Sequence, residues 1–166
     1  MDQEALSKIQ GPLKEAYKQD PGGAKITLSA TGRVGEGVTC SVPTGQALVQ
    51  AGLHPATGGD GLSACSGDML LQALVACAGV TLGAVATSLG IEVGDASLTA
   101  EGDLDFRGTL SVAKEAPVGF SAIRLRVDLA EEVSEEQRAL LAKLTERFCV
   151  VFQTLAAPPA MSVSFG

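Results

Sequence analysis

The sequence predicts a mixed fold of helices and strands built around one long apolar helix. Residues 69–91, MLLQALVACAGVTLGAVATSLGI, have no charged side chain, and a helix that is apolar on all sides is buried in a protein or a membrane. Residues 24–42 and 92–129 contain stretches in which apolar and polar side chains alternate, as in half-buried strands. Residues 134–147 repeat apolar side chains in helical register.

The chain is expected to divide into an N-terminal helical arm, residues 1–23, and one globular domain, residues 24–166. Acidic residues come early in the arm and lysines later, which suits the helix dipole. Gly11–Pro12 is expected to interrupt the helix, because proline removes a backbone donor and clashes with the preceding turn. The arm is therefore expected to lie on the surface.

The domain is expected to begin with a β-hairpin. AKITLSATG, residues 24–32, and EGVTCSV, residues 36–42, both alternate and are separated by a glycine-containing turn that includes Arg33. Residues 43–66 are rich in Gly, Pro, Ser and Thr and are expected to form a long loop, of the kind that is often functional.

The long apolar stretch has clear signals at both ends. Ser66 is a good N-cap, Asp68 would lie in the first turn, and Gly90 is a natural stop. One helix is therefore expected from Gly67 to Leu89, about 35 Å long at 1.5 Å per residue.

The rest of the chain is expected to return to strands and then to helices. Ser134 precedes two glutamates and is expected to cap a helix. The expected elements are strands within 92–106 and 120–129, a helix at 134–147, a short turn or second helix at 148–155, and a C-terminal strand at 160–165.

A membrane span is the first alternative for the apolar helix, because it is long enough to cross a bilayer. Its flanks are Asp68 and Glu92 rather than Lys or Arg, and the chain has no Trp and one Tyr to form an interfacial belt. We therefore expect a buried central helix and no membrane. Small residues such as Gly79 and Gly83 would let a second helix approach closely, and one chain of 166 residues is short for covering such a helix. A homodimer with these helices near its centre is expected.

Composition and charge exclude several classes of function. The net charge of -7 disfavours nucleic acid as a partner, and the N-terminus lacks the features of a secretory signal, so the cytoplasm is the expected location. The cysteines form no C-x-x-C pair, and the sequence has one histidine, so no metal and no bound cofactor are expected. That histidine, His54, is expected to be a hydrogen-bonding loop residue. In a reducing compartment the cysteines are either inert buried thiols or redox groups; they are Cys40, Cys65, Cys77 and Cys149.

Two cysteine-containing segments resemble the signatures of the OsmC/Ohr family. SGDMLLQALVACAGVTL, residues 66–82, is similar to the run Pro-x-Glu-Leu-Leu-x-Ala-x-x-x-Cys that opens the family's central helix. RFCVVFQTL, residues 147–155, resembles the family's later Cys-Pro-Val-x-x-x-Leu segment. The resemblance spans roughly Ala24 to Gly166. It implies an α+β, OsmC-like fold in which antiparallel sheets pack around a long central apolar helix, in an intertwined homodimer.

The resemblance also implies an activity, that of a thiol peroxidase reducing organic hydroperoxides and hydrogen peroxide. Cys77 would be the peroxidatic thiolate, attacking the peroxide to give a sulfenic acid. Cys149 would condense with that acid to form a disulfide. An external dithiol, a lipoyl group in some members of the family, would reduce the pair. Cys65 is an alternative resolving thiol.

Activation of Cys77 needs a further group, because an apolar helix raises the pKa of a thiol. The family uses an arginine held by a glutamate; Arg33 is the best match for the first and Asp68 the only carboxylate near the place of the second. In an unbroken helix Asp68 is about 13 Å from Cys77 and on the opposite face, so it would act only through an arginine. Ser66 and Val150 replace two prolines of the family pattern. These departures keep a second interpretation open, a non-catalytic OsmC-like protein that binds a small apolar ligand at the dimer interface.

Overall fold

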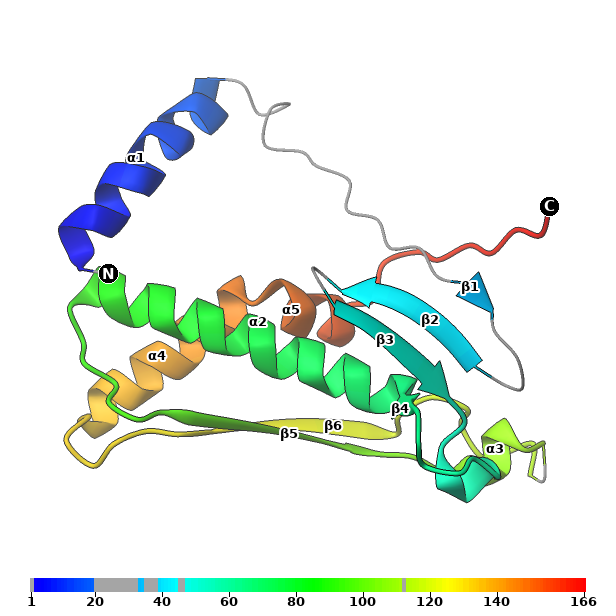
Figure 1. The fold of residues 1–166 in the computed structure, drawn as a ribbon. Helices are drawn as coiled ribbons and strands as arrows, with labels where there is room; N and C mark the ends of the chain where they lie inside the picture. The colour runs from blue at the N-terminus through cyan, green and yellow to red at the C-terminus, as the bar shows by residue number, and fades with distance from the viewer. Residues whose placement is uncertain (1, 20–32, 35–38, 45–46, 112) are drawn as a thin grey trace. The chain divides into compact units, whose positions relative to one another are not determined.

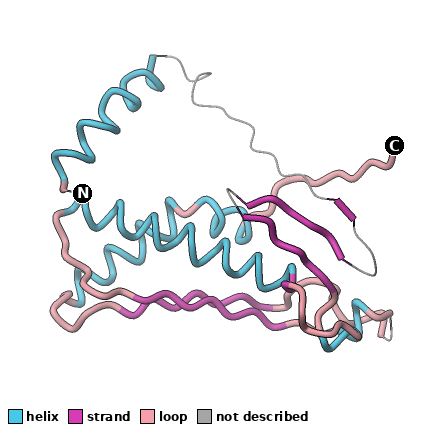
Figure 2. The backbone as a smooth tube through the Cα atoms, viewed as in Figure 1, coloured by secondary structure: helices cyan, strands magenta, loops and turns pink. Residues whose placement is uncertain are grey.

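The protein is described here from a computed structural model, which covers residues 2–19, 33–34, 39–44, 47–111 and 113–166. Helices and strands are mixed along the chain, as predicted (Figures 1 and 2). The chain forms two compact units. The first, unit 1, comprises Met1–Lys18, Ala73–Thr99 and Leu125–Gly166, and the second, unit 2, comprises Gln19–Gln72 and Ala100–Arg124. The predicted division into an arm and a domain stays a prediction.

The predicted long helix is present as α2, Ser66–Leu89, and begins one residue earlier than expected. Its end is fixed by Gly90, whose φ of 65° is left-handed. The N–H of Gly90 donates to the carbonyl of Thr87 (3.2 Å) and the N–H of Ile91 to that of Ala86 (2.9 Å), the two bonds of a Schellman motif. Among the described helices, α2 alone is long and apolar enough to cross a membrane by length and composition.

One side of α2 packs into the core of unit 1. The buried cluster consists of Leu82, Val85 and Ala86 from α2 with Val133 and Leu141. Partly buried side chains of the strands β5, Ser97–Asp103, and β6, Ala122–Asp128, surround it. This packing is what a core helix of a globular protein requires.

Unit 1 also contains α4, Glu135–Phe148, which confirms the predicted helix, and α5, Val150–Ala156, which shows that a second helix rather than a short turn follows it. Ser134 caps α4 in a capping box with Gln137, as its position before the glutamates predicted.

The N-terminal helix α1, Gln3–Gln19, is continuous, so the predicted interruption at Gly11–Pro12 is wrong. Two side-chain interactions stabilise its start. The Asp2 carboxylate accepts from the N–H of Ala5 (2.8 Å), and Glu4 forms an ion pair with Lys8 one turn later (2.7 Å). The helix continues past Pro12 and forgoes the bond that the missing N–H would make.

Unit 2 holds a four-stranded sheet, in the order β1 (Arg33–Val34), β2 (Thr39–Thr44), β3 (Ala47–Gly52) and β4 (Ala64–Cys65). The β1–β2 and β2–β3 pairs are antiparallel, whereas β3–β4 is parallel. The second strand of the predicted hairpin corresponds to β2, and the first, residues 24–32, lies outside the described residues.

Two of the sequence expectations about strands are wrong. Residues 47–52 were expected in a loop but form β3, because their backbone pairs with β2 along its whole length, from Thr39↔Gly52 to Thr44↔Ala47. Residues 160–165 were expected as a strand, yet no strand forms among the described residues after α5. Within the described part of the chain these residues pair with no strand, and Phe165 is 94% exposed.

The remaining elements agree with the sequence pattern. β5 and β6 form a two-stranded sheet, and both alternate between exposed and partly buried residues along their length. The loops of unit 2 contain two short helices, η1 (Pro55–Thr57) and α3 (Phe106–Thr109).

Candidate active site

The two predicted redox cysteines lie in unit 1 at different kinds of position. Cys77 lies midway along α2 and is half-buried. Cys149 lies at the junction of α4 and α5, where it is the C-cap of one helix and the N-cap of the other, with extended backbone angles (φ −73°, ψ 108°). Its side chain is fully buried. The helix junction therefore fixes Cys149, while Cys77 stays partly open to solvent.

The structure brings these two side chains together. The Cys149 thiol hydrogen-bonds to the Cys77 sulfur, so the two sulfurs are neighbours although 72 residues separate them in the sequence. Cys77, Cys149 and cysteine 65 are all free thiols. Two neighbouring thiols are the starting point for an intramolecular disulfide.

The surroundings of Cys77 favour its thiolate. Burial is the largest single influence and raises the pKa of Cys77. Hydrogen bonds from the backbone of Val151, the Cys149 side chain and the backbone of Val150 outweigh it, so that the pKa of Cys77 is lowered below the usual range of a thiol. Such a thiol reacts faster near neutral pH, because the thiolate is the nucleophile.

Two of these donors come from the start of α5. The first N–H groups of a helix have no acceptor within the helix. In α5, the N–H of Phe152 donates to the Cys149 sulfur (3.4 Å). The N–H groups of Val150 and Val151 lower the pKa of Cys77, and that of Val151 also lowers the pKa of Cys149. Backbone N–H groups therefore lower the pKa of Cys77, an effect that the resemblance assigned to an arginine.

The sequence analysis missed these donors, although it contained a signal for one of them. Val150 stands where the OsmC/Ohr signature has a proline, and any residue other than proline adds an N–H at that point. The Thr81 hydroxyl contributes less. It has one proton to donate, and its bond to the carbonyl of Cys77 (2.8 Å) uses that proton.

The pKa of Cys149 moves the other way. Burial raises it most, and the hydrogen bond and negative charge of Cys77 raise it further; the N–H groups of Phe152 and Val151 only partly compensate. Of the two thiols, Cys77 is therefore the one that ionises more readily, and Cys149 is the one that keeps its proton to higher pH. Cys77 is therefore suited to act as the nucleophile, and Cys149 to react with it in a later step.

The other predicted site residues are less well placed. Arg33 opens β1, and its side chain is outside what the structure describes, so its role stays a prediction. Asp68 lies in the first turn of α2 and is exposed. Both belong to unit 2. Cys65, the alternative resolving thiol, ends β4 in the same unit, and the thiol that bonds to Cys77 is Cys149.

His54 is a structural loop residue, as predicted. Its Nδ1 accepts from the N–H of Ala56 (3.0 Å) at the start of η1, and its ring stacks on Phe106 with the centroids 4.9 Å apart. Within the described ranges, no three His, Cys, Asp or Glu side chains come together as a metal site would need.

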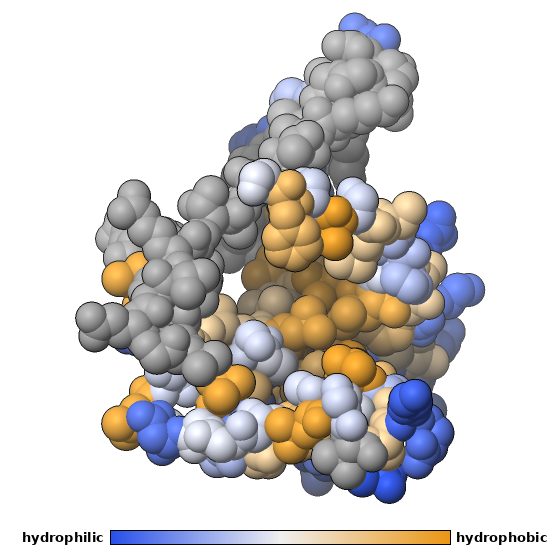
Figure 3. Space-filling view, turned by 90° about the vertical axis from the view of Figure 1, so that its right-hand side faces the viewer, coloured by the Kyte–Doolittle hydropathy of each residue, from blue (hydrophilic) through white to orange (hydrophobic). Residues whose placement is uncertain are grey.

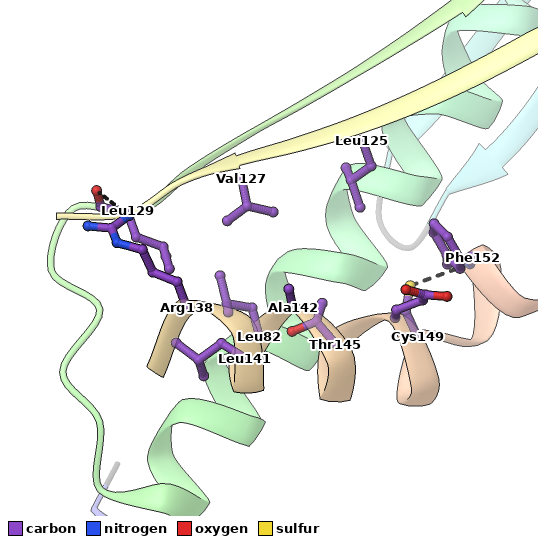
Figure 4. Close-up of a pocket in the computed structure, with 11 residues that line it drawn as sticks. Leu82, Leu125, Val127, Leu129, Arg138, Leu141, Ala142, Thr145, Cys149 and Phe152 are labelled. Atoms are coloured by element: carbon purple, nitrogen blue, oxygen red, sulfur yellow. Dashed lines mark hydrogen bonds between the residues drawn. The ribbon is translucent and has the colours of Figure 1, made fainter. Parts of the chain in front are cut away.

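Cys149 also borders a cavity of about 300 Å³ in unit 1 (Figure 4). Figure 4 shows Leu125 and Val127 entering it from β6, with Ala142 and Thr145 opposite them on α4. The cavity is mainly aliphatic, and of the two paired cysteines it is Cys149 that forms part of its wall.

Known protein families and solved structures include relatives of this chain. The OsmC-like protein family matches residues 58–164, a stretch that includes both cysteines. The chain belongs to the OsmC-like family. Comparison with curated protein sequences gave no match.

Solved structures similar to this OsmC-like chain share its fold at low identity. An OsmC-like protein from Mycoplasma pneumoniae is 16% identical, with a TM-score of 0.67 over 81% of this chain and 90% of the other. An organic hydroperoxide resistance protein from Legionella pneumophila is 15% identical (TM-score 0.63, 80% and 93% covered). The organic hydroperoxide resistance protein OhrB of Bacillus subtilis is 19% identical (TM-score 0.57, 80% and 93% covered). These likenesses confirm the predicted α+β, OsmC-like fold with its long central helix.

Proposed function

We propose that this protein is a cysteine-based peroxidase that reduces organic hydroperoxides and hydrogen peroxide. The observation that carries the proposal is the Cys77–Cys149 pair, in which hydrogen bonds lower the pKa of one thiol and burial raises that of its neighbour. Membership of the OsmC-like family and the likeness to two organic hydroperoxide resistance proteins support it.

The reaction follows from the roles of the two sulfurs. The Cys77 thiolate attacks one peroxide oxygen, the O–O bond breaks, and the leaving alkoxide takes a proton to become the alcohol. The Cys149 thiol then attacks the sulfur of the Cys77 sulfenic acid. A disulfide forms, and the hydroxyl leaves as water with the proton of Cys149. Arg33 is proposed to stabilise the Cys77 thiolate and to orient the peroxide, and Asp68 is proposed to hold the arginine in position.

A second substrate is needed to complete the cycle. An external dithiol reduces the Cys77–Cys149 disulfide through a mixed disulfide and is itself oxidised to a disulfide. Lipoyl groups are the candidates that the family resemblance suggests. The chemistry needs no metal or bound cofactor. Free thiols at three of the described cysteines suit a reducing compartment, and we place the protein in the cytoplasm.

The protein is proposed to act as a homodimer. Along one face of α2, small or apolar residues are exposed at helical spacing, and Val80 is 77% exposed. Exposed apolar side chains also occur on the surface shown in Figure 3. The C-terminal segment adds Met161, Val163 and Phe165, which alternate like a strand without a neighbour. Apolar surface of this kind marks an interface. Sedimentation of the protein as a monomer at micromolar concentration would contradict the dimer.

Single-turnover thiol counting on the two cysteine variants tests the activity. The reduced Cys77→Ser protein should lose no thiol to a slight excess of cumene hydroperoxide. The Cys149→Ser protein should lose one and become reactive toward a sulfenic-acid reagent such as dimedone. If both variants behave like the wild type, or if wild-type thiols persist for minutes, the peroxidase assignment fails. Persistence would favour the alternative, a non-catalytic OsmC-like protein that binds a small apolar ligand.

A further inference from the structure

A side chain that the proposed reaction does not use ties α5 to α4. Gln153 lies on α5 and is exposed, and its Nε2 donates to the carbonyl of Glu146 on α4 (2.9 Å). This hydrogen bond spans the break between the two helices at Cys149, which Figure 4 shows at the point where they meet. Gln153 therefore braces the junction that holds one of the two redox cysteines.

The break at Cys149 rearranges the backbone hydrogen bonds of both helices. The N–H of Cys149 donates to the carbonyl of Thr145 (2.9 Å), and the carbonyl of Cys149 accepts from the N–H of Gln153 (2.9 Å). Between these two bonds, a ψ of 108° takes the chain out of the helical path. In a continuous helix the N–H of Val150 would donate to the carbonyl of Glu146, four residues earlier. No such bond joins these two groups among the described residues.

The donor and the acceptor that the break separates serve different purposes. The N–H of Val150 lowers the pKa of Cys77. The carbonyl of Glu146 accepts from the Gln153 side chain instead. A carbonyl at the end of a helix needs a partner from outside the helix, and the N–H of Val150 is the one that a longer α4 would supply. Gln153 therefore occupies an acceptor that competes with Cys77 for this N–H.

We propose that Gln153 is a positioning residue: by hydrogen-bonding to the carbonyl of Glu146, it keeps α4 from continuing through Cys149 and leaves the N–H of Val150 available to Cys77. Gln153 acts through the backbone and not on the sulfur itself. Its importance for turnover rests on the proposed peroxidase function. Its effect on the Cys77 thiol can be measured without any peroxide.

The rate of iodoacetamide modification of Cys77 between pH 5 and 9, in the reduced full-length protein, tests the proposal. Gln153→Met keeps the length of the side chain and removes the donor. It should react about threefold more slowly near pH 7, with its inflection at higher pH, because the thiolate loses part of one hydrogen bond. Gln153→Ala also lacks the donor, favours the helix, and should give the same shift. Thr154→Val changes the next residue, which is also exposed, and should leave the profile unchanged.

A double variant distinguishes positioning from a general disturbance of the junction. Val150→Pro has no N–H that the carbonyl of Glu146 could capture, so adding Gln153→Met to it should change the Cys77 rate by less than about 1.5-fold. An equal loss in both backgrounds would overturn the proposal, and so would wild-type profiles in both Gln153 variants. A protein that shows the predicted shifts but does not consume cumene hydroperoxide would contradict the proposed function and leave the role of Gln153 standing. Far-ultraviolet circular dichroism of each variant controls for folding.

Discussion

Replacing Val150 by proline should remove one of the donors that stabilise the Cys77 thiolate. Val150 is the first residue of α5, and its N–H hydrogen-bonds to the Cys77 sulfur. Proline has no N–H but is favoured at the first position of a helix. The preceding residue, Cys149, already has extended backbone angles, which a following proline requires. The Val150 side chain is 71% exposed, so little packing is lost.

The expected effect follows from the strength of one hydrogen bond. A hydrogen bond to a charged group contributes about 1.5 kcal/mol at the lower end of its range. Losing it should reduce the thiolate population of Cys77 at neutral pH about tenfold, and its reaction rate by about the same factor. The overall stability should change little, because neither helix loses a backbone hydrogen bond.

The assay is the rate of iodoacetamide modification of Cys77 between pH 5 and 9, followed by mass spectrometry of the peptide. Val150→Pro should react about tenfold more slowly near pH 7 and its inflection should move to higher pH. Val150→Ala keeps the N–H and is the matched control; it should behave like the wild type. If proline and alanine variants have the same rate and inflection, backbone donation from α5 does not activate Cys77.

Three further changes test other parts of the structure. Because the Cys149 thiol helps to lower the pKa of Cys77, Cys149→Ala should move the inflection of the Cys77 alkylation profile to higher pH. Cys149→Ser keeps a donor and should move the inflection less. Equal profiles for the two variants would show that the Cys149 side chain does not affect the pKa of Cys77. Thr145→Val removes a buried unpaired hydroxyl and should stabilise the protein by about 1 kcal/mol, raising Tm by about 2–4 °C in calorimetry without added ligand; a lower Tm would show that the hydroxyl is bonded. Gly90→Ala places a Cβ in open space but at a φ of 65°, and should destabilise the protein by about 1 kcal/mol in urea unfolding; no loss would mean that the Schellman motif does not fix the end of α2.

The lowered pKa of Cys77 and the raised pKa of Cys149 also set the pH dependence of stability. A group whose pKa falls on folding stabilises the protein above its unfolded pKa, and this contribution is lost as the pH falls through the folded value. For Cys77 the stabilisation is therefore lost as the pH falls below the usual pKa range of a thiol. For Cys149 the contribution is present at lower pH and is lost as the pH rises above that range.

Local signals in the sequence predicted much of the fold. The ends of α2 and the cap of α4 depend on single residues, Gly90 and Ser134, whose chemistry acts within one helical turn. The sheet of β5 and β6 followed from alternation. β3 was missed because pairing with β2 holds its backbone, and strand pairing depends on residues that a local pattern does not contain.

The candidate site shows the same division between local and non-local information. Residue types and family signatures pointed to Cys77 and Cys149, but only the folded chain brings their sulfurs together. The N–H donors of Val150 and Val151 carry no side-chain signature and depend on where α5 begins. The cavity is lined by side chains from four elements, α2, β6, α4 and α5, so no segment alone predicts it.

The central claim is that Cys77 and Cys149 form one redox pair that peroxide oxidises. Intact-mass and peptide mass spectrometry of the reduced protein, quenched after one equivalent of cumene hydroperoxide, tests it most directly. The account predicts that the protein loses two hydrogens, that a single disulfide links the peptides of Cys77 and Cys149, and that one equivalent of cumyl alcohol appears. An unchanged mass, or a disulfide that excludes Cys77, would contradict it.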